Sequence, residues 1–350
     1  MLADKYRLCP RGHLPRVTLP SLSLKEPAVI DAHIHYGDDS PEFLALLAEF
    51  DLKLLNISFV HGPDDPWRNQ AERYRSLARA HPTRFAWCTS IDLPRFDDPT
   101  YTASAIRGLE EDFAAGAVAC KVWKNIGMEE RRPDGSYLTI DDPIFDPIFD
   151  AVAAAGRTLL LHIAEPLACW QPLDPSGPHY SYYSQNPQWH MYNRPEVPSH
   201  AALIAARDRV MEKHPALRVV GAHLGSLEHD VDEVAARLDR YPNFAVDISA
   251  RLGNLARQPA DKVRAFFDRY QDRILFGTDV VMRTAPAALP PEERAAALAP
   301  LAETYRTHFA YLEGTTEVTV RGYTTTGLGL SPSVLDKLYT ANAQAWYPGI

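Results

Sequence analysis

The sequence has few cysteines and no long apolar run. Its 350 residues include four cysteines, which show neither C-x-x-C spacing nor the density of a disulfide scaffold. Cys9 and His13 are spaced like half of a metal site, but no second pair stands nearby. No stretch of 18 apolar residues is present, and the first thirty residues contain no uninterrupted apolar segment of a secretory signal. We therefore expect a cytoplasmic protein without a membrane span.

The sequence also lacks an excess of positive charge. Its formal net charge is -9, with 46% hydrophobic and 23% charged residues. Nucleic acids and anionic membranes select for basic surfaces, so neither is an expected partner. The composition is that of an ordinary globular chain whose partner is a small molecule, and it leaves open whether the chain forms a homo-oligomer.

Short apolar runs typical of strands alternate with amphipathic segments typical of helices. The predicted strands cover 28–35, 53–62, 84–93, 117–123, 158–165, 218–225, 243–249 and 273–279. The predicted helices cover 71–82, 102–116, 143–156, 201–215, 230–242 and 260–272. No G-x-G-x-x-G follows the first strand, so the alternation favours a (β/α)₈ TIM barrel over an open dinucleotide-binding sheet. We expect an N-terminal arm over residues 1–27 and one barrel domain over 28–350.

Polar residues stand at the ends of these apolar strands, where a barrel places its active site. His33 and His35 are two residues apart, so in a strand their rings project to one side. The other strand-end residues are His61, Asp92, Lys121, His162, Glu165, His223, Asp247, Arg251 and Asp279. One histidine at a strand end is usually structural, but their recurrence around one barrel rim indicates a functional site.

Four motifs occur in a specific order: H-x-H at 33–35, LLLHIAEP at 159–166, VVGAHLGS at 219–226 and ILFGTDV at 274–280. With LDKLYTANAQAWYPG at 335–349, they resemble the amidohydrolase superfamily, specifically its amidohydrolase-related group of metal-dependent barrels. The resemblance spans nearly the whole chain. It implies the metal ligands His33, His35, His162 and Asp279, with Asp279 also the general base. A divalent cation at such a site, Zn²⁺ or Mn²⁺, lowers the pKa of its water and so generates a nucleophile.

Two residues decide whether one or two ions bind. The segment around Lys121 is similar to that of binuclear relatives in which a lysine carbamate bridges two metals. Lys121 could equally stay cationic and pair with a substrate carboxylate. His223 could ligate a second metal or polarise a substrate carbonyl as a hydrogen-bond donor.

A segment rich in aromatic residues and proline, 166–198, follows the fifth strand and has little periodicity. Loops of this length are often lids, and Trp189 and Tyr192 would then contact substrate; permanent packing over the rim is the alternative. Further substrate-binding candidates are Trp123, Lys124, Arg251 and Arg283. The cations among them favour an anionic, carboxylated substrate.

Three functions fit these observations. The first is a metal-dependent hydrolase acting on a lactone, amide or related bond of a carboxylated substrate. The second is a decarboxylase or other lyase, because the resemblance extends to such members of the superfamily. The third is a binding protein without turnover, against which the complete ligand set argues. Lys121 favours the hydrolase, because the lyases tend to lack a lysine on strand four.

Overall fold

The computed structural model describes residues 28–62, 65–282 and 284–350. The predicted arm, residues 1–27, lies outside the described residues, and so do Cys9, His13 and Arg283. No helix in the described part of the chain is long and apolar enough to cross a membrane.

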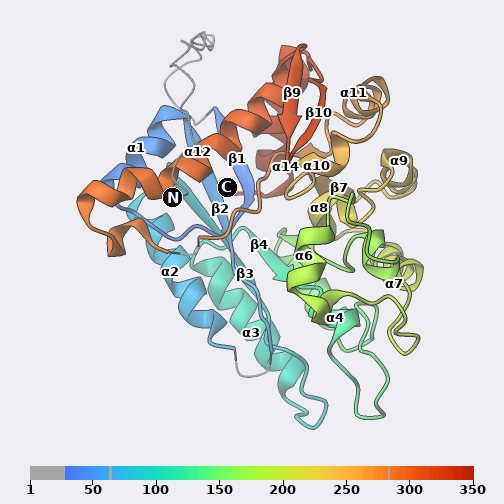
Figure 1. Ribbon diagram of the computed structural model, residues 1–350. Coiled ribbons are helices and arrows are strands. Elements are labelled where there is room, and N and C mark those ends of the chain that lie inside the picture. Colours follow the sequence, from blue (N-terminus) through green and yellow to red (C-terminus); the bar gives the residue numbers. More distant parts are fainter. Residues whose placement is uncertain (1–27, 63–64, 283) are drawn as a thin grey trace, which may run out of the picture.

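Eight parallel strands pair in sequence order and form a nearly closed barrel (Figure 1). They are β1 (Val29–Ile34), β2 (Leu52–Ile57), β3 (Phe85–Ser90), β4 (Ala119–Val122), β5 (Thr158–Leu161), β6 (Arg218–Gly221), β7 (Phe244–Asp247) and β8 (Ile274–Leu275). Backbone bonds connect β1 to β8 and the segment after it, from Ala32 N to Phe276 O (3.0 Å) and from Asp279 N to His33 O (2.7 Å). The architecture is consistent with the predicted TIM barrel.

The longer helices surround the strands, and each predicted helical segment overlaps one of them (Figure 1). They are α1 (Pro41–Glu49), α2 (Trp67–Ala80), α3 (Tyr101–Ala114), α5 (Asp146–Ala154), α7 (His200–Lys213), α9 (Val231–Arg240), α11 (Ala260–Arg269) and α12 (Pro291–Glu313). In α9 the side chain of Asp230 caps the first turn, and Val231, Val234 and Leu238 form the buried face. That spacing is the helical period that sequence analysis uses.

Shorter elements connect or extend these layers. They are α4 (Asn125–Met128), η1 (Leu167–Trp170), α6 (Tyr180–Gln185), η2 (Pro187–Trp189), α8 (Ala222–Gly225), α10 (Leu252–Leu255), η3 (Pro286–Ala288), α13 (Pro332–Asp336), η4 (Lys337–Ala341) and α14 (Asn342–Trp346). An antiparallel hairpin, β9 (Glu317–Val320) and β10 (Tyr323–Thr326), follows α12. Neither α12 nor this hairpin was among the elements that the sequence pattern predicted.

The barrel interior is an apolar core that the C-terminal helix completes. Ile30 and Leu160 pack there together with Trp346 and Tyr347 of the C-terminal region. The Asn342 side chain donates hydrogen bonds to the carbonyl oxygens of Gln271 and Ile274, both at 2.7 Å. These bonds fix α14 beside the start of β8, so the end of the chain lies opposite the rim that carries the histidines.

An irregularity in β1 sets the direction of both histidines. The pairing of β1 with β2 shifts register between Asp31 and Ile34. Before the shift Ile30 packs in the interior core, and after it Ile34 packs in the outer layer, although a regular strand would place both on one face. A bulge inserts one residue and so reverses which face the following side chains occupy. His33 and His35 consequently line the cavity at the barrel mouth.

A buried carboxylate, Asp31, ties the histidine strand to β8 and α12. It accepts hydrogen bonds from the Thr278 hydroxyl (2.6 Å) and the Tyr305 hydroxyl (2.8 Å), and also from the backbone N–H groups of His33 and Thr278. Burial raises the pKa of Asp31 to about 7, although these hydrogen bonds oppose the shift. Asp31 therefore holds three elements of the rim together without facing the cavity.

Candidate metal centre

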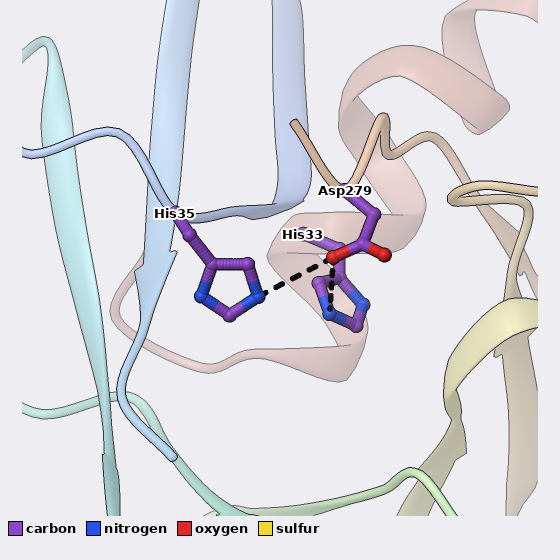
Figure 2. A group of neighbouring side chains, drawn as sticks. All are labelled: His33, His35 and Asp279. Carbon is purple, nitrogen blue, oxygen red and sulfur yellow. Dashed lines mark ion pairs between the residues drawn. The ribbon is translucent and has the colours of Figure 1, made fainter. Parts of the chain in front are cut away.

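Three side chains from distant parts of the sequence converge at the mouth of the barrel (Figure 2). Potential ligand atoms of His33, His35 and Asp279 all lie within 4.8 Å of one another. The Asp279 Oδ1 atom is 3.3 Å from His35 Nε2 and 3.7 Å from His33 Nε2. Both histidines are buried, whereas Asp279 is 25% exposed and faces the cavity. A carboxylate with two imidazoles is a donor set that divalent transition metals prefer.

Hydrogen bonds fix the tautomers of these rings. His35 Nδ1 lies 2.7 Å from the Ile57 carbonyl, and His223 Nδ1 lies 2.9 Å from the Ser249 carbonyl. A carbonyl oxygen only accepts, so in both rings Nδ1 carries the proton and Nε2 keeps its lone pair. His33 Nδ1 likewise lies 2.8 Å from a carboxylate oxygen of Asp247. Each ring therefore offers Nε2 toward Asp279, with His223 Nε2 at 3.8 Å from Oδ2.

Burial favours the neutral form of three imidazoles, those of His33, His162 and His223. It lowers the pKa of His33, and it lowers the pKa of His162 and His223 well below the usual range. A neutral imidazole is the form that binds a metal.

His162 lies beside the three-residue group but is not part of it. Its ring centroid is 4.4 Å from that of His223, and it lines the same cavity. Its Nε2 atom is buried and has no hydrogen-bond partner among the described residues. A buried polar atom without a partner is costly unless a ligand uses it. This atom and the Nε2 lone pairs of His33, His35 and His223 fit a divalent cation. The assignment of His33, His35, His162 and Asp279 as its ligands stays our prediction.

Asp247 supports the site from behind. Its Oδ1 accepts hydrogen bonds from the backbone N–H groups of His223 (2.9 Å) and Ser249 (3.1 Å), while Oδ2 accepts from His33. Although burial opposes ionisation, the neighbouring His33 ring and these hydrogen bonds lower the pKa of Asp247. His33, His223 and Asp247 also lie close enough together to hold a metal. The contact between His33 Nδ1 and Asp247 Oδ2 is, however, already a hydrogen bond through the Nδ1 proton. We interpret Asp247 as a positioning residue rather than a ligand.

Lys121 is buried within the site. Its Nζ lies 3.4 Å from His33 Nε2, and burial lowers its pKa to about 8. A lowered pKa increases the fraction of free amine, which carbamate formation requires. The ammonium form would instead pair with a substrate carboxylate. Both interpretations of Lys121 stay predictions.

The family model for amidohydrolases matches residues 30–349. The chain belongs to the amidohydrolase family. The match supports the resemblance noted in the sequence and, with the His–His–Asp group, identifies a metal-dependent enzyme of that superfamily.

Solved structures show the same fold for this amidohydrolase. A 2,6-dihydroxybenzoate decarboxylase from Rhizobium is 16% identical with a TM-score of 0.52, over 93% of this chain and 99% of that one. A 5-carboxyvanillate decarboxylase from Sphingomonas paucimobilis is 16% identical with a TM-score of 0.51, over 89% and 83%. A 4-oxalomesaconate hydratase from Rhodopseudomonas palustris is 12% identical with a TM-score of 0.51, over 92% and 96%. No curated protein matches the sequence.

A cavity of about 870 Å³ opens onto the histidines of this amidohydrolase. Of the predicted substrate-binding residues, Trp123, Lys124 and Arg251 line it, whereas Trp189 and Tyr192 do not. Trp189 is buried behind the residues that line the cavity. Its ring centroid lies 5.3 Å from that of Trp123 and 4.0 Å from the Lys124 ammonium. Tyr192 is 41% exposed.

Lys124 faces the cavity but its charge is already paired. Glu165, also buried, forms an ion pair with the Lys124 ammonium, and the Tyr182 hydroxyl lies 3.1 Å from the same nitrogen. The Tyr183 hydroxyl donates to the other Glu165 oxygen at 3.0 Å. Lys124 is therefore less available to a substrate anion than its position in the sequence indicated.

Sequence reasoning missed one wall of the cavity. It comes from α12 and the β9–β10 hairpin, through Pro300, Glu303, Thr304, Thr307, His308, Thr319, Val320 and Arg321. The segment 166–198 supplies Pro166, Pro178, His179 and Tyr182. The sequence did contain a signal for the hairpin, because short runs of β-branched residues, 318–320 and 324–326, flank Arg321–Gly322. No sequence signal indicated that the hairpin would lie at the barrel mouth.

Proposed function

We propose that this amidohydrolase is a metal-dependent decarboxylase of a small aromatic or conjugated carboxylic acid. The observation that carries the proposal is the contrast between two walls of the cavity. Phe59, His61 and Trp123 form an aromatic wall, with ring centroids 4.6–5.3 Å apart. Arg251 and Arg321 line the cavity as cations. A planar acid would stack on the first wall and place an anionic group on the second.

A lyase fits this cavity better than the hydrolase that the sequence favoured. Two of the solved structures with similar folds are decarboxylases of aromatic acids and one is a hydratase. Identity this low shows the fold alone, so these likenesses support the reaction class only as analogy. The aromatic wall adds support that does not depend on them.

Different residues of the site would bind the cation and transfer the proton. His33, His35, His162 and Asp279 would hold one divalent cation, Zn²⁺ or Mn²⁺, with His223 beside it. When bound, the cation supplies Lewis-acid polarisation of a substrate oxygen. Breaking the bond to the carboxyl carbon releases CO₂ and leaves an electron pair on the ring or alkene carbon, which must gain a proton. Asp279 and His223 both face the cavity and are placed to relay that proton, which one of them must first take up from solvent, because Asp279 is ionised and His223 Nε2 carries a lone pair.

The segment 166–198 would act as a lid of the single barrel domain, 28–350. His179 and Tyr182 bring it to the cavity, and Trp189 anchors it against Trp123 from behind. Closing the mouth would exclude water from the carbanion-like transition state, which favours protonation by a side chain over exchange with solvent.

The test is a panel of substrates with the metal-loaded protein. Hydroxybenzoic acids and unsaturated dicarboxylic acids are assayed for released CO₂, and lactones and N-acyl amides are assayed for hydrolysis. We expect CO₂ release that chelation abolishes and metal addition restores. Hydrolysis of a lactone or amide without any decarboxylation would overturn the proposal.

One observation favours the hydrolase as a second candidate. Lys121 is buried with its Nζ 3.4 Å from His33 Nε2, where a carbamate could bridge two ions. Metal stoichiometry separates the candidates, because the bridge requires two ions and the decarboxylase site described above requires one.

A further inference from the structure

An arginine occupies an unusual backbone position at the tip of the β9–β10 hairpin. Arg321 and Gly322 form the two-residue connection, and both have positive φ, 48° and 77°. Such turns strongly prefer asparagine, aspartate or glycine first, because other side chains crowd the backbone there. A residue that the turn itself disfavours is a candidate for a functional role.

The hairpin directs Arg321 into the barrel mouth. The residue lines the cavity. Its side chain passes over Gly253 of α10, where an added Cβ would meet Arg321 Cδ at 3.3 Å. The start of α10 adjoins Arg251, so two arginines from distant parts of the sequence line one cavity at this end of α10.

Arg251 is already partly engaged. Its side chain is buried, its Nη1 donates to the Ala250 carbonyl (3.3 Å), and its Nε lies 3.5 Å from an oxygen of buried Glu228. That Nε has no hydrogen bond among the described residues. The guanidinium is therefore held in place while part of its hydrogen-bonding capacity stays free.

Arg321 has no ion pair or hydrogen bond among the described residues, and the other charges at the cavity do not supply one. Glu165 is paired with Lys124, and Asp279 belongs to the histidine group. Glu303 lies 3.9 Å from Arg306 on its own helix and is 71% exposed. Burial and the positive charge of Arg251 both lower the pKa of Arg321, so the two guanidiniums lie close enough to interact. Two cations in such a position repel unless an anion lies between them.

We propose that Arg251 and Arg321 bind a carboxylate that the substrate keeps, so that the enzyme selects acids with a second anionic group. The inference rests on the proposed function for the identity of the group that leaves. A carboxylate held by two guanidiniums is stabilised as an anion, and that stabilisation is lost when it becomes CO₂. Such a pair therefore suits a retained carboxylate, while the reacting one lies at the histidine group.

The experiment measures binding rather than turnover. Benzene-1,3-dicarboxylate and benzoate are titrated calorimetrically into the metal-loaded protein, its Arg321→Asn variant and a control, Arg257→Gln. Asparagine followed by Gly322 is the favoured sequence for this turn, so Arg321→Asn removes the guanidinium without weakening the hairpin. Arg257 stacks on Tyr323 of the same hairpin at 4.9 Å but does not line the cavity.

We expect the wild type to bind the dicarboxylate more tightly than benzoate. Arg321→Asn should weaken dicarboxylate binding about tenfold or more, the equivalent of one charge-assisted hydrogen bond, with little change for benzoate. Arg257→Gln should leave both affinities within about twofold, because Arg257 is a half-buried residue that does not line the cavity. The melting temperature of Arg321→Asn should equal or exceed that of the wild type.

Two results would overturn the inference: equal affinity of the wild type for both acids, or equal losses for both in Arg321→Asn. Failure of the proposed function is distinguishable, because the dicarboxylate titration needs no catalysis. A protein that releases no CO₂ from any acid but still loses dicarboxylate binding in Arg321→Asn would refute the decarboxylase and keep the anion site. A protein that releases CO₂ but whose dicarboxylate affinity is unchanged in Arg321→Asn would refute the anion site and keep the decarboxylase.

Discussion

Replacing Asp247 with asparagine tests whether the hydrogen bonds behind the histidines prepare them for a metal. In the native site Oδ1 accepts from two backbone N–H groups, those of His223 and Ser249, and Oδ2 accepts from His33 Nδ1. The asparagine oxygen must take the place of Oδ1, because backbone N–H groups need an acceptor. Its amide NH₂ then faces His33 Nδ1 at the native distance of 2.8 Å.

Two donors cannot share that contact, so His33 must give up its Nδ1 proton and carry it on Nε2. The Nε2–H tautomer has no lone pair toward Asp279 and cannot bind a cation there. Loss of a carboxylate that orients a ligating histidine typically costs 10–100-fold in metal affinity, or about 1.4–2.7 kcal/mol. We expect Asp247→Asn to fall in this range with its overall fold intact, because the replacement has the same shape.

The assay is competition for Zn²⁺ with a chromophoric chelator, combined with circular dichroism of the metal-free protein. A matched control is Asp272→Asn, which removes a carboxylate that is 72% exposed and pairs with Lys337 at 2.7 Å. Nitrogen chemical shifts of the imidazoles report the His33 tautomer directly. Unchanged Zn²⁺ affinity with an altered tautomer would refute the assignment of His33 as a ligand, and an unchanged tautomer would refute the hydrogen-bond argument.

The remaining predictions concern the roles left open at the cavity. Asp279→Asn should lower turnover by several orders of magnitude while the fold and much of the metal binding persist, because the amide cannot carry the proton; a rate near that of the wild type would contradict this role. Lys121→Ala should lose one metal equivalent if Lys121 is carboxylated, and elemental analysis showing one ion in both proteins would exclude the bridge. Trp189→Ala should destabilise the fold by about 3–5 kcal/mol, as for a buried tryptophan, whereas Tyr192→Ala should leave the melting temperature nearly unchanged; similar thermal scans for both would show that burial does not separate them.

Much of the barrel could be predicted from the sequence because its signals are local. Each strand is a short apolar run, and each helix that follows carries its buried residues at helical spacing. The pair His33 and His35 also follows a local rule, since residues two apart in a strand share a face. Predicting that this face is the inner one required knowledge of the register shift between Asp31 and Ile34, which depends on the pairing with β2. Local alternation carries no information about such a shift.

The positions of several cavity residues depend on tertiary contacts and could not be predicted from the sequence. Trp189 lies in an aromatic segment that favours a lid contact, yet its ring packs against Trp123 from behind the cavity wall. Arg321 lies almost three hundred residues from His33, and only the course of α12 and the hairpin brings it to the same cavity. Lys124 was expected to attract anions, but Glu165 reaches it from the neighbouring strand end.

Backbone strain is concentrated on the half of the rim that holds the later site residues. After β5, β6, β7 and β8, the left-handed region is occupied by Ala164, by His223 with Leu224, by Ala250 and by Asp279, with φ between 57° and 64°. Each such conformation costs roughly 1–2 kcal/mol for a residue with a side chain. Hydrogen bonds to buried groups offset it: His223 N donates to Asp247, and Asp279 N donates to the His33 carbonyl. The backbone therefore leaves these strands in a sharp turn that a rigid scaffold maintains, so the positions of His223 and Asp279 are set before any cation or substrate arrives.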